Sequence, residues 1–222
     1  MTRARIDIGE EVAAKKAFVW AIDWPGWCRG GKDRDLAIEA LVAHRGRYAK
    51  VARRAGLELA QVESSDLRVV ESVGGGGGTE FGVPSTITKD DRRRVTKADA
   101  ERLASLIEAA WVIFDRVAER SPAELRKGPR GGGRDRDKMI GHVIEADHAY
   151  AREIGVRKPE PSFADREAVE AERAAVLDAL RQPSDGSPLA DRKWTPRYAA
   201  RRIAWHALDH AWEMEDRAED SS

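Results

Sequence analysis

Two histidines lie one helical turn apart near the C-terminus, in the segment RRIAWHALDHAWEMEDR. Residues four apart share one face of a helix, so the imidazoles of His206 and His210 would lie side by side. Neutral imidazole is the commonest side-chain ligand of divalent transition metals, and this spacing therefore indicates a metal site. The plainer alternative is two buried, hydrogen-bonded histidines packed beside Trp205 and Trp212.

A third histidine is positioned to join this pair from a different helix. At about 100° per residue, His206 and His210 fall on the apolar stripe of their helix, which should face a helical core. His142, in DKMIGHVIEADHAYARE, lies at the border of the apolar arc of its own segment. His148 points about 120° away from His142 and is predicted to face solvent. His44, in a basic stretch, is also predicted to lie at the surface.

Three imidazoles and one open position form the ligand set of many catalytic zinc sites. We expect water or a thiol in the open position, since a bound divalent metal makes a nucleophile available near neutral pH. Glu145, one turn after His142, is the candidate for a catalytic general base. Asp209 and Glu213 are placed to orient a histidine through its second ring nitrogen. Neither the nearby carboxylates nor Cys28 are expected to close the site as a fourth ligand.

The segment LRKGPRGGGRDRD, residues 125–137, leads into the helix that carries His142. Its arginines could clamp an anionic group near the metal, because guanidinium forks suit carboxylates and phosphates. The favoured alternative is an exposed interhelical loop, because Asp135 and Asp137 partly cancel the charge of the arginines. A pocket at the open metal position is expected beside this segment.

The first 75 residues have the pattern of a small β/α unit. The segments ARIDIG, KAFVWAIDW and LRVVESV show the alternation or the β-branched content of strands. Between them, DLAIEALVAHRGRYAKVARRAG predicts one helix that closes at Gly56. The five glycines from Gly74 to Gly78 open a Gly/Pro/Ser segment that extends to about Asp91. No Gly-Lys-Ser/Thr follows them, so the segment predicts a flexible, protease-sensitive linker rather than a phosphate loop.

From Thr96 onward the chain has the pattern of helices. Thr96 heads a capping box, and Thr195 followed by Pro196 is typical of a helix start. Four amphipathic segments of similar length predict a four-helix bundle. The predicted fold class is therefore α+β, with a small β/α domain over residues 1–90 and an up-down four-helix bundle over residues 91–222.

The order of the histidines resembles a known family. One histidine in the second helix (His142) and a His-x-x-x-His pair in the fourth, within AWHALDHAWE, resemble the DinB-like superfamily of metalloproteins. The resemblance covers about residues 95–220. It implies that His142, His206 and His210 coordinate a divalent transition metal such as Zn, Ni or Fe/Mn. It also implies a thiol-dependent isomerase or S-transferase activity.

A second resemblance concerns the N-terminal part, where AFVWAIDWPGWCRGGKDRDLAIEALVAHRGRYA resembles the strand–turn–helix of HicB-like antitoxin domains. The favoured function is a metal-dependent transferase, isomerase or hydrolase acting on a small-molecule substrate, with a low-molecular-weight thiol as one candidate. The alternative is a non-enzymatic ligand-binding or regulatory, antitoxin-like module. A third interpretation keeps the histidines as core groups without a metal.

Composition excludes several other classes of function. Lys and Arg total 39 and Asp and Glu total 39, so no net charge attracts nucleic acid or an anionic membrane. No apolar run approaches the roughly 20 residues that span a bilayer. The first residues lack the pattern of a signal peptide and Cys28 is the single cysteine, which together indicate a cytoplasmic protein. A homodimer is one candidate assembly.

Overall fold

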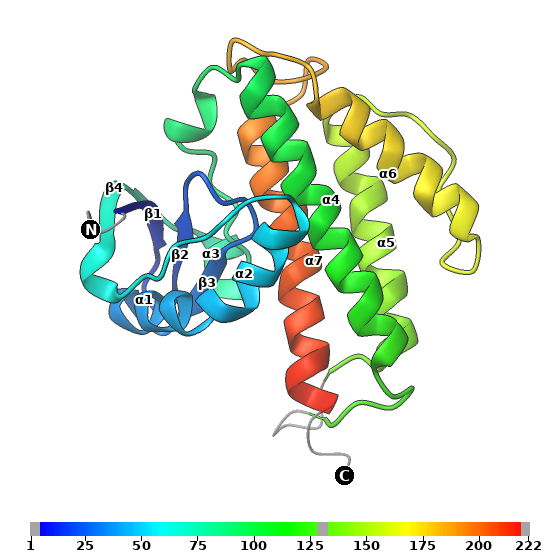
Figure 1. Ribbon diagram of the computed structural model, residues 1–222, viewed down its shortest axis with the longest axis horizontal. Helices are drawn as coiled ribbons and strands as arrows, with labels where there is room; N and C mark the ends of the chain where they lie inside the picture. The colour runs from blue at the N-terminus through cyan, green and yellow to red at the C-terminus, as the bar shows by residue number, and fades with distance from the viewer. Residues whose placement is uncertain (1–4, 128–132, 219–222) are drawn as a thin grey trace.

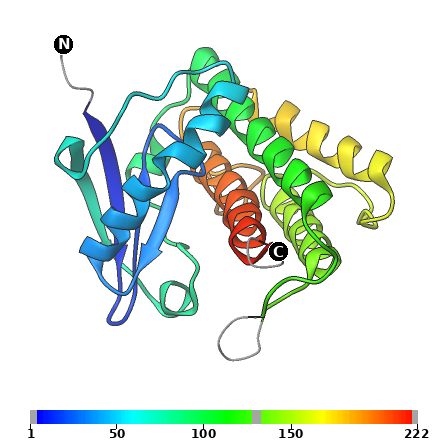
Figure 2. The same ribbon diagram turned by 60° about the horizontal axis from the view of Figure 1, so that its bottom comes forward.

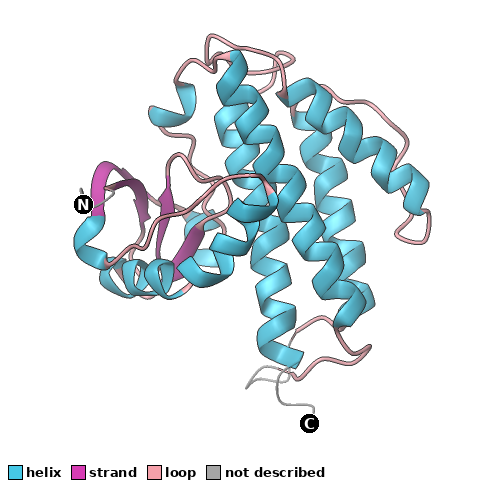
Figure 3. Cartoon of the chain, in the orientation of Figure 1, coloured by secondary structure: helices cyan, strands magenta, loops and turns pink. Residues whose placement is uncertain are grey.

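The computed structural model describes residues 5–127 and 133–218 as an α+β protein (Figures 1 and 3). A mixed four-stranded sheet with its helices comes first, and four long helices packed together follow. The predicted fold class is confirmed. No helix among the described residues is long and apolar enough to cross a membrane.

The sheet combines three neighbouring strands with one distant strand. Strands β1 (Ile6–Val12), β2 (Ala17–Ala21), β3 (Cys28–Gly31) and β4 (Leu67–Gly74) lie in the order β3-β2-β1-β4. β1 runs antiparallel to β2 and parallel to β4. β3 falls where the sequence predicts only a Gly-containing connection. Gly9 of β1 faces the indole of Trp20, where an added Cβ would lie 2.4 Å from the ring, so a larger residue would displace Trp20.

One predicted helix is two helices in the structure. α1 (Arg34–Ala43) and α2 (Arg45–Arg54) meet at His44, whose backbone angles are φ −84° and ψ 0°. α1 packs on β2 and β3, whereas α2 packs on the first of the long helices. A single straight helix could not contact both surfaces. Tertiary packing therefore overrides the local periodicity at this point.

Four long helices form the C-terminal part. They are α4 (Lys97–Arg120), α5 (Arg136–Glu153), α6 (Arg166–Leu180) and α7 (Pro196–Ala218). Thr96 Oγ1 accepts from the Asp99 amide at 3.2 Å, and the Asp99 carboxylate accepts from the Thr96 amide at 3.0 Å, which completes the predicted capping box. α7 begins at Pro196, directly after Thr195, as predicted.

α7 lies at the centre of the molecule, between the sheet and the other long helices (Figure 2). One side presents Ile203 and Met214 to the helical core, at 1% and 0% exposure. The opposite side places Trp205 against Phe18 and Trp20 of β2. Most buried apolar residues of both parts of the chain belong to one continuous cluster. Burial on two sides explains why α7 is apolar around most of its circumference.

The Gly/Pro/Ser segment between the sheet and α4 is packed against both parts of the chain. It carries the short helices α3 (Gly77–Phe81) and η2 (Asp90–Arg92), while η1 (Ser64–Asp66) precedes β4. Thr88 and Asp91 are 3% and 5% exposed. This packing differs from that expected of a linker, and the predicted flexibility and protease sensitivity stay predictions. The division into two domains at residue 90 stays a prediction.

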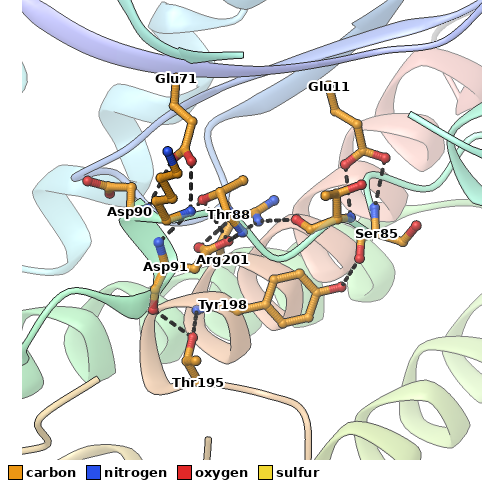
Figure 4. A network of polar contacts seen from close by, with 11 residues as sticks. Glu11, Glu71, Ser85, Thr88, Asp90, Asp91, Thr195, Tyr198 and Arg201 are labelled. Atoms are coloured by element: carbon orange, nitrogen blue, oxygen red, sulfur yellow. Dashed lines mark hydrogen bonds and ion pairs between the residues drawn. The ribbon is translucent and has the colours of Figure 1, made fainter. Parts of the chain in front are cut away.

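Two carboxylates of the sheet hold the backbone of this segment (Figure 4). Glu11 of β1 is fully buried and accepts from the amides of Ser85 and Thr86 at 3.3 and 3.0 Å. Glu71 of β4 accepts from the amides of residues 89 and 90 at 2.7 and 3.0 Å. Glu11 precedes Ser85 by 74 residues, so composition and local spacing gave no sign of this contact.

Candidate metal centre

Three imidazoles meet between α5 and α7. The Nε2 atoms of His142 on α5 and His206 on α7 are 3.3 Å apart. The ring centre of His210 lies 4.7 Å from that of His206 and 4.9 Å from that of His142. One nitrogen from each ring lies within 4.8 Å of the other two. The three histidines therefore converge as predicted, and the cluster could hold a metal ion.

The spacing of the nitrogens suits a single ion. Two ligand atoms at about 2.1 Å from a tetrahedral zinc lie about 3.4 Å apart, which is close to the 3.3 Å between His142 and His206. The nitrogen of His210 is within 4.8 Å of both. His206 is 6% exposed, whereas His142 and His210 are half-buried. Two of the three imidazoles are therefore partly exposed to solvent.

The imidazoles of His142 and His206 are uncharged near neutral pH. Burial, the charge of Arg134 and the neighbouring His210 lower the pKa of His142 to about 4. Burial and the two other histidines lower the pKa of His206 well below its usual value. A neutral imidazole keeps a nitrogen lone pair available, which is the form that a metal ion binds.

Glu213 orients the third imidazole. Its carboxylate accepts from Nδ1 of His210 at 3.0 Å and from Arg217 at 2.9 Å. Burial raises the pKa of Glu213, but its hydrogen bonds and ion pairs with His210 and Arg217 outweigh burial and lower it. Since Nδ1 donates to Glu213, Nε2 of His210 is left free for a ligand bond. Asp209, predicted for the same role, instead accepts from Arg29 of β3 at 2.9 Å.

No carboxylate or thiol joins the three imidazoles within the part of the chain that the structure describes. Glu145 is exposed on α5, and no hydrogen bond or ion pair links it to another described residue, so its role as general base stays a prediction. Cys28 is fully buried among Phe18, Trp20 and Trp205, on the sheet side of α7. Burial raises the pKa of this thiol to about 12, which keeps it uncharged.

Tyr150 of α5 and Arg202 of α7 flank the cluster, although neither belongs to a metal-binding pattern in the sequence. Arg202 Nη2 donates to the Tyr150 hydroxyl at 3.1 Å, and the Tyr150 ring centre lies 5.6 Å from that of His206. Arg202 also stacks over Trp205 at 4.8 Å. Its Nη1 atom is buried and has no hydrogen-bond partner among the described residues. The position of Tyr150, about two turns after His142 on one helix, is the signal that could have identified it.

The segment before α5 is held against the C-terminal end of α7. Arg217 Nε donates to the Arg126 carbonyl at 2.6 Å, and the Arg126 amide donates to the Arg217 carbonyl at 3.2 Å. Burial makes the largest contribution to the lowered pKa of His142, and the charge of Arg134 makes the second largest. The sequence predicts a pocket beside residues 125–137. Residues 128–132 of this segment lie outside the described residues, so the pocket beside them stays a prediction.

His148 is buried, so the prediction that it faces solvent is wrong. It is 8% exposed, and its Nδ1 atom lies 2.7 Å from a carboxylate oxygen of Glu172 on α6. His148 and His142 point to different sides of α5, as predicted, but α6 packs on the side where His148 lies. His44 is also half-buried, with its ring centre 5.3 Å from that of Trp212. Both histidines lie outside the cluster.

Replacing His148 by alanine is expected to lower the free energy of unfolding by about 2 kcal/mol, because the buried carboxylate of Glu172 would lose its partner. Metal content should not change. Urea unfolding measures the first effect and elemental analysis the second. The double variant His148→Leu/Glu172→Met should be less destabilised than His148→Ala, since no buried charge is left alone. A loss below about 0.5 kcal/mol for His148→Ala would contradict the contact.

Fold and site together define an α+β protein with a three-histidine cluster between two of its long helices. No protein-family model, curated protein or solved structure matches the chain. The resemblance to the DinB-like superfamily therefore rests on the order and helix placement of the histidines.

Proposed function

We propose that the protein binds a divalent transition metal through His142, His206 and His210. The observation that carries this proposal is the convergence of one nitrogen from each ring within 4.8 Å. Zinc is the first candidate, because three imidazoles are a common zinc ligand set. Nickel and Fe/Mn are the alternatives. The same arrangement supports the proposal that the helical part is a member of the DinB-like superfamily.

We further propose that the bound metal serves catalysis, in a transferase, isomerase or hydrolase. Structural zinc sites usually have four protein ligands, whereas catalytic sites keep three and leave a position for substrate. Three histidines without a fourth ligand among the described residues fit the second pattern. The metal, when bound, would lower the pKa of a water molecule or a thiol and so supply a nucleophile near neutral pH.

Residues beside the cluster favour a substrate with an anionic group. Arg202 keeps a buried guanidinium nitrogen without a partner among the described residues. Because the Tyr150 oxygen accepts from Arg202, the Tyr150 hydroxyl proton is free to donate to a substrate oxygen. Arg134 adds positive charge on the side of His142. A low-molecular-weight thiol that carries carboxylates suits this environment.

The test of this function combines metal analysis with turnover. Protein purified without chelators should contain about one divalent ion per chain. It should then be assayed with thiols of low molecular weight for S-transfer and isomerisation, and with ester and amide substrates for hydrolysis. Turnover that is lost with EDTA and restored by zinc would support the proposal. Stoichiometric metal with no turnover in any of these assays would remove the enzyme assignment and favour a non-enzymatic metal-binding module.

Replacing Glu213 by glutamine should weaken zinc binding by about 10–100-fold, the usual cost of losing a carboxylate that orients a ligand histidine. The glutamine amide can still occupy the position of the Glu213 carboxylate, but it lacks the negative charge that keeps the proton on Nδ1 of His210. Competition with a chromophoric zinc chelator measures the affinity. Glu145→Gln is the matched control, because Glu145 is exposed and makes no hydrogen bond to another described residue. It should leave zinc affinity unchanged, and a loss of turnover in that variant alone would support Glu145 as the general base.

A further inference from the structure

A strongly basic groove lies between α2, α4 and the C-terminal end of α7. Its volume is about 820 Å³. The cationic side chains that line it are Arg47, Lys50, Arg53, Arg54, Arg116 and Arg120. Its apolar lining includes Ile113, Val117 and the largely buried Trp212. Trp212 lies two residues after His210, so the groove and the histidine cluster are on opposite sides of α7, about 160° apart.

Most of these cations lack a counter-ion within residues 5–127 and 133–218. Arg47 pairs with Glu215 and Asp216 of α7. Among the described residues, the other five cations of the groove make no ion pair. Elsewhere in the fold, some arginines, such as the exposed Arg166 and the half-buried Arg181, have carboxylate partners. Other exposed arginines, such as Arg152, also make no ion pair among the described residues, so what distinguishes the groove is that five such cations line one concave site.

This clustering of like charge lowers stability unless something binds there. The chain as a whole has equal numbers of basic and acidic residues, so the groove is a local concentration of positive charge. Arg116 and Arg120 lie four residues apart on α4, where like charges on one helix face repel. Glu215, which pairs with Arg47, also lines the groove, so the lining is mainly but not wholly basic. A concave site with such an excess of one charge focuses the electric field and attracts a counter-charged ligand.

We propose that the groove binds a small organic polyanion, with an aromatic or apolar body and at least two phosphate groups. A diphosphate carries about three negative charges near neutral pH, which matches the unpaired cations better than a single carboxylate does. The apolar surface between the two cationic walls suits the body of the ligand. A volume of about 820 Å³ is typical of small-molecule sites, which span roughly 300–1,000 Å³.

Calorimetric titration of the full chain with ADP, inorganic pyrophosphate and adenosine tests this proposal. ADP should bind most tightly, because it supplies both the phosphates and the aromatic body. Its affinity should fall as salt rises from about 0.05 M to about 0.3 M, since salt screens these charges. Arg116→Ala/Arg120→Ala should weaken ADP binding by at least about tenfold, with the fold verified by circular dichroism. Arg152→Ala is the matched control, because Arg152 is an exposed helical arginine outside the groove, and it should bind ADP normally.

The outcomes separate the groove from the histidine cluster. ADP binding that persists in His206→Ala would support a site independent of the metal. Binding that is lost in folded His206→Ala, or that is unchanged in the double arginine variant, would overturn the proposal. It would also be overturned if duplex DNA bound and ADP did not, because a nucleic-acid surface would then explain the charge.

Discussion

Replacing His206 by alanine is expected to abolish metal binding, with the ion content falling to near zero and zinc affinity falling by more than about a hundredfold. His206 lies close to both other ligands, with its Nε2 atom 3.3 Å from that of His142 and its ring centre 4.7 Å from that of His210. No carboxylate or thiol in the described part of the chain can replace it. The remaining pair of imidazoles would hold an ion too weakly to survive purification.

Stability supplies an independent measurement of the same site. A ligand that binds only the folded state stabilises it, by about 2.7 kcal/mol when its concentration is a hundred times its dissociation constant. EDTA should therefore lower the melting temperature of the unmodified protein and leave that of His206→Ala unchanged. His44→Ala is the control, because His44 is a half-buried histidine outside the cluster, and its response to EDTA should match the unmodified protein. An unmodified protein with no bound metal and no response to EDTA would establish the histidines as core groups alone.

Replacing Arg201 by methionine is expected to destabilise the fold by about 3–5 kcal/mol, because it leaves a buried carboxylate without its partner. Arg201 of α7 is 5% exposed and donates to both carboxylate oxygens of Asp91, at 2.6 and 3.2 Å. It also donates to the Thr86 carbonyl at 3.1 Å and lies over the Trp20 ring at 4.4 Å. One side chain thus joins the sheet, the segment before α4 and the central helix (Figure 4).

A double-mutant cycle in urea isolates this ion pair. Arg201→Met/Asp91→Asn should cost at least about 1 kcal/mol less than the sum of the two single variants, because no charge is left unpaired. Arg166→Met is the surface control: the Arg166 side chain is 59% exposed, and its loss should cost at most about 1 kcal/mol. An Arg201→Met variant no less stable than this control would show that the segment before α4 docks without the ion pair.

The sequence by itself determined the features that depend on neighbouring residues. Thr96 caps the start of α4 and Pro196 begins α7, since capping preferences act over three or four residues of chain. The spacing of His206 and His210 places both imidazoles on one helix face whatever packs there. His142 lies at the border of the apolar arc of its own helix, and this position was enough to predict that it would meet His206 and His210.

Only the tertiary structure decided which faces are covered and by what. Asp209 and Glu213 are both close to His210 in sequence, but only Glu213 is hydrogen-bonded to it. Asp209 turns toward the sheet and pairs with Arg29, which lies 180 residues earlier in the chain. In the same way, α6 covers His148. α1 and α2 pack on different surfaces, and carboxylates of the sheet bind the backbone of the segment that follows the glycine run. Periodicity shows that a face is apolar or polar, but a buried polar group takes its partner from whichever distant element packs against it.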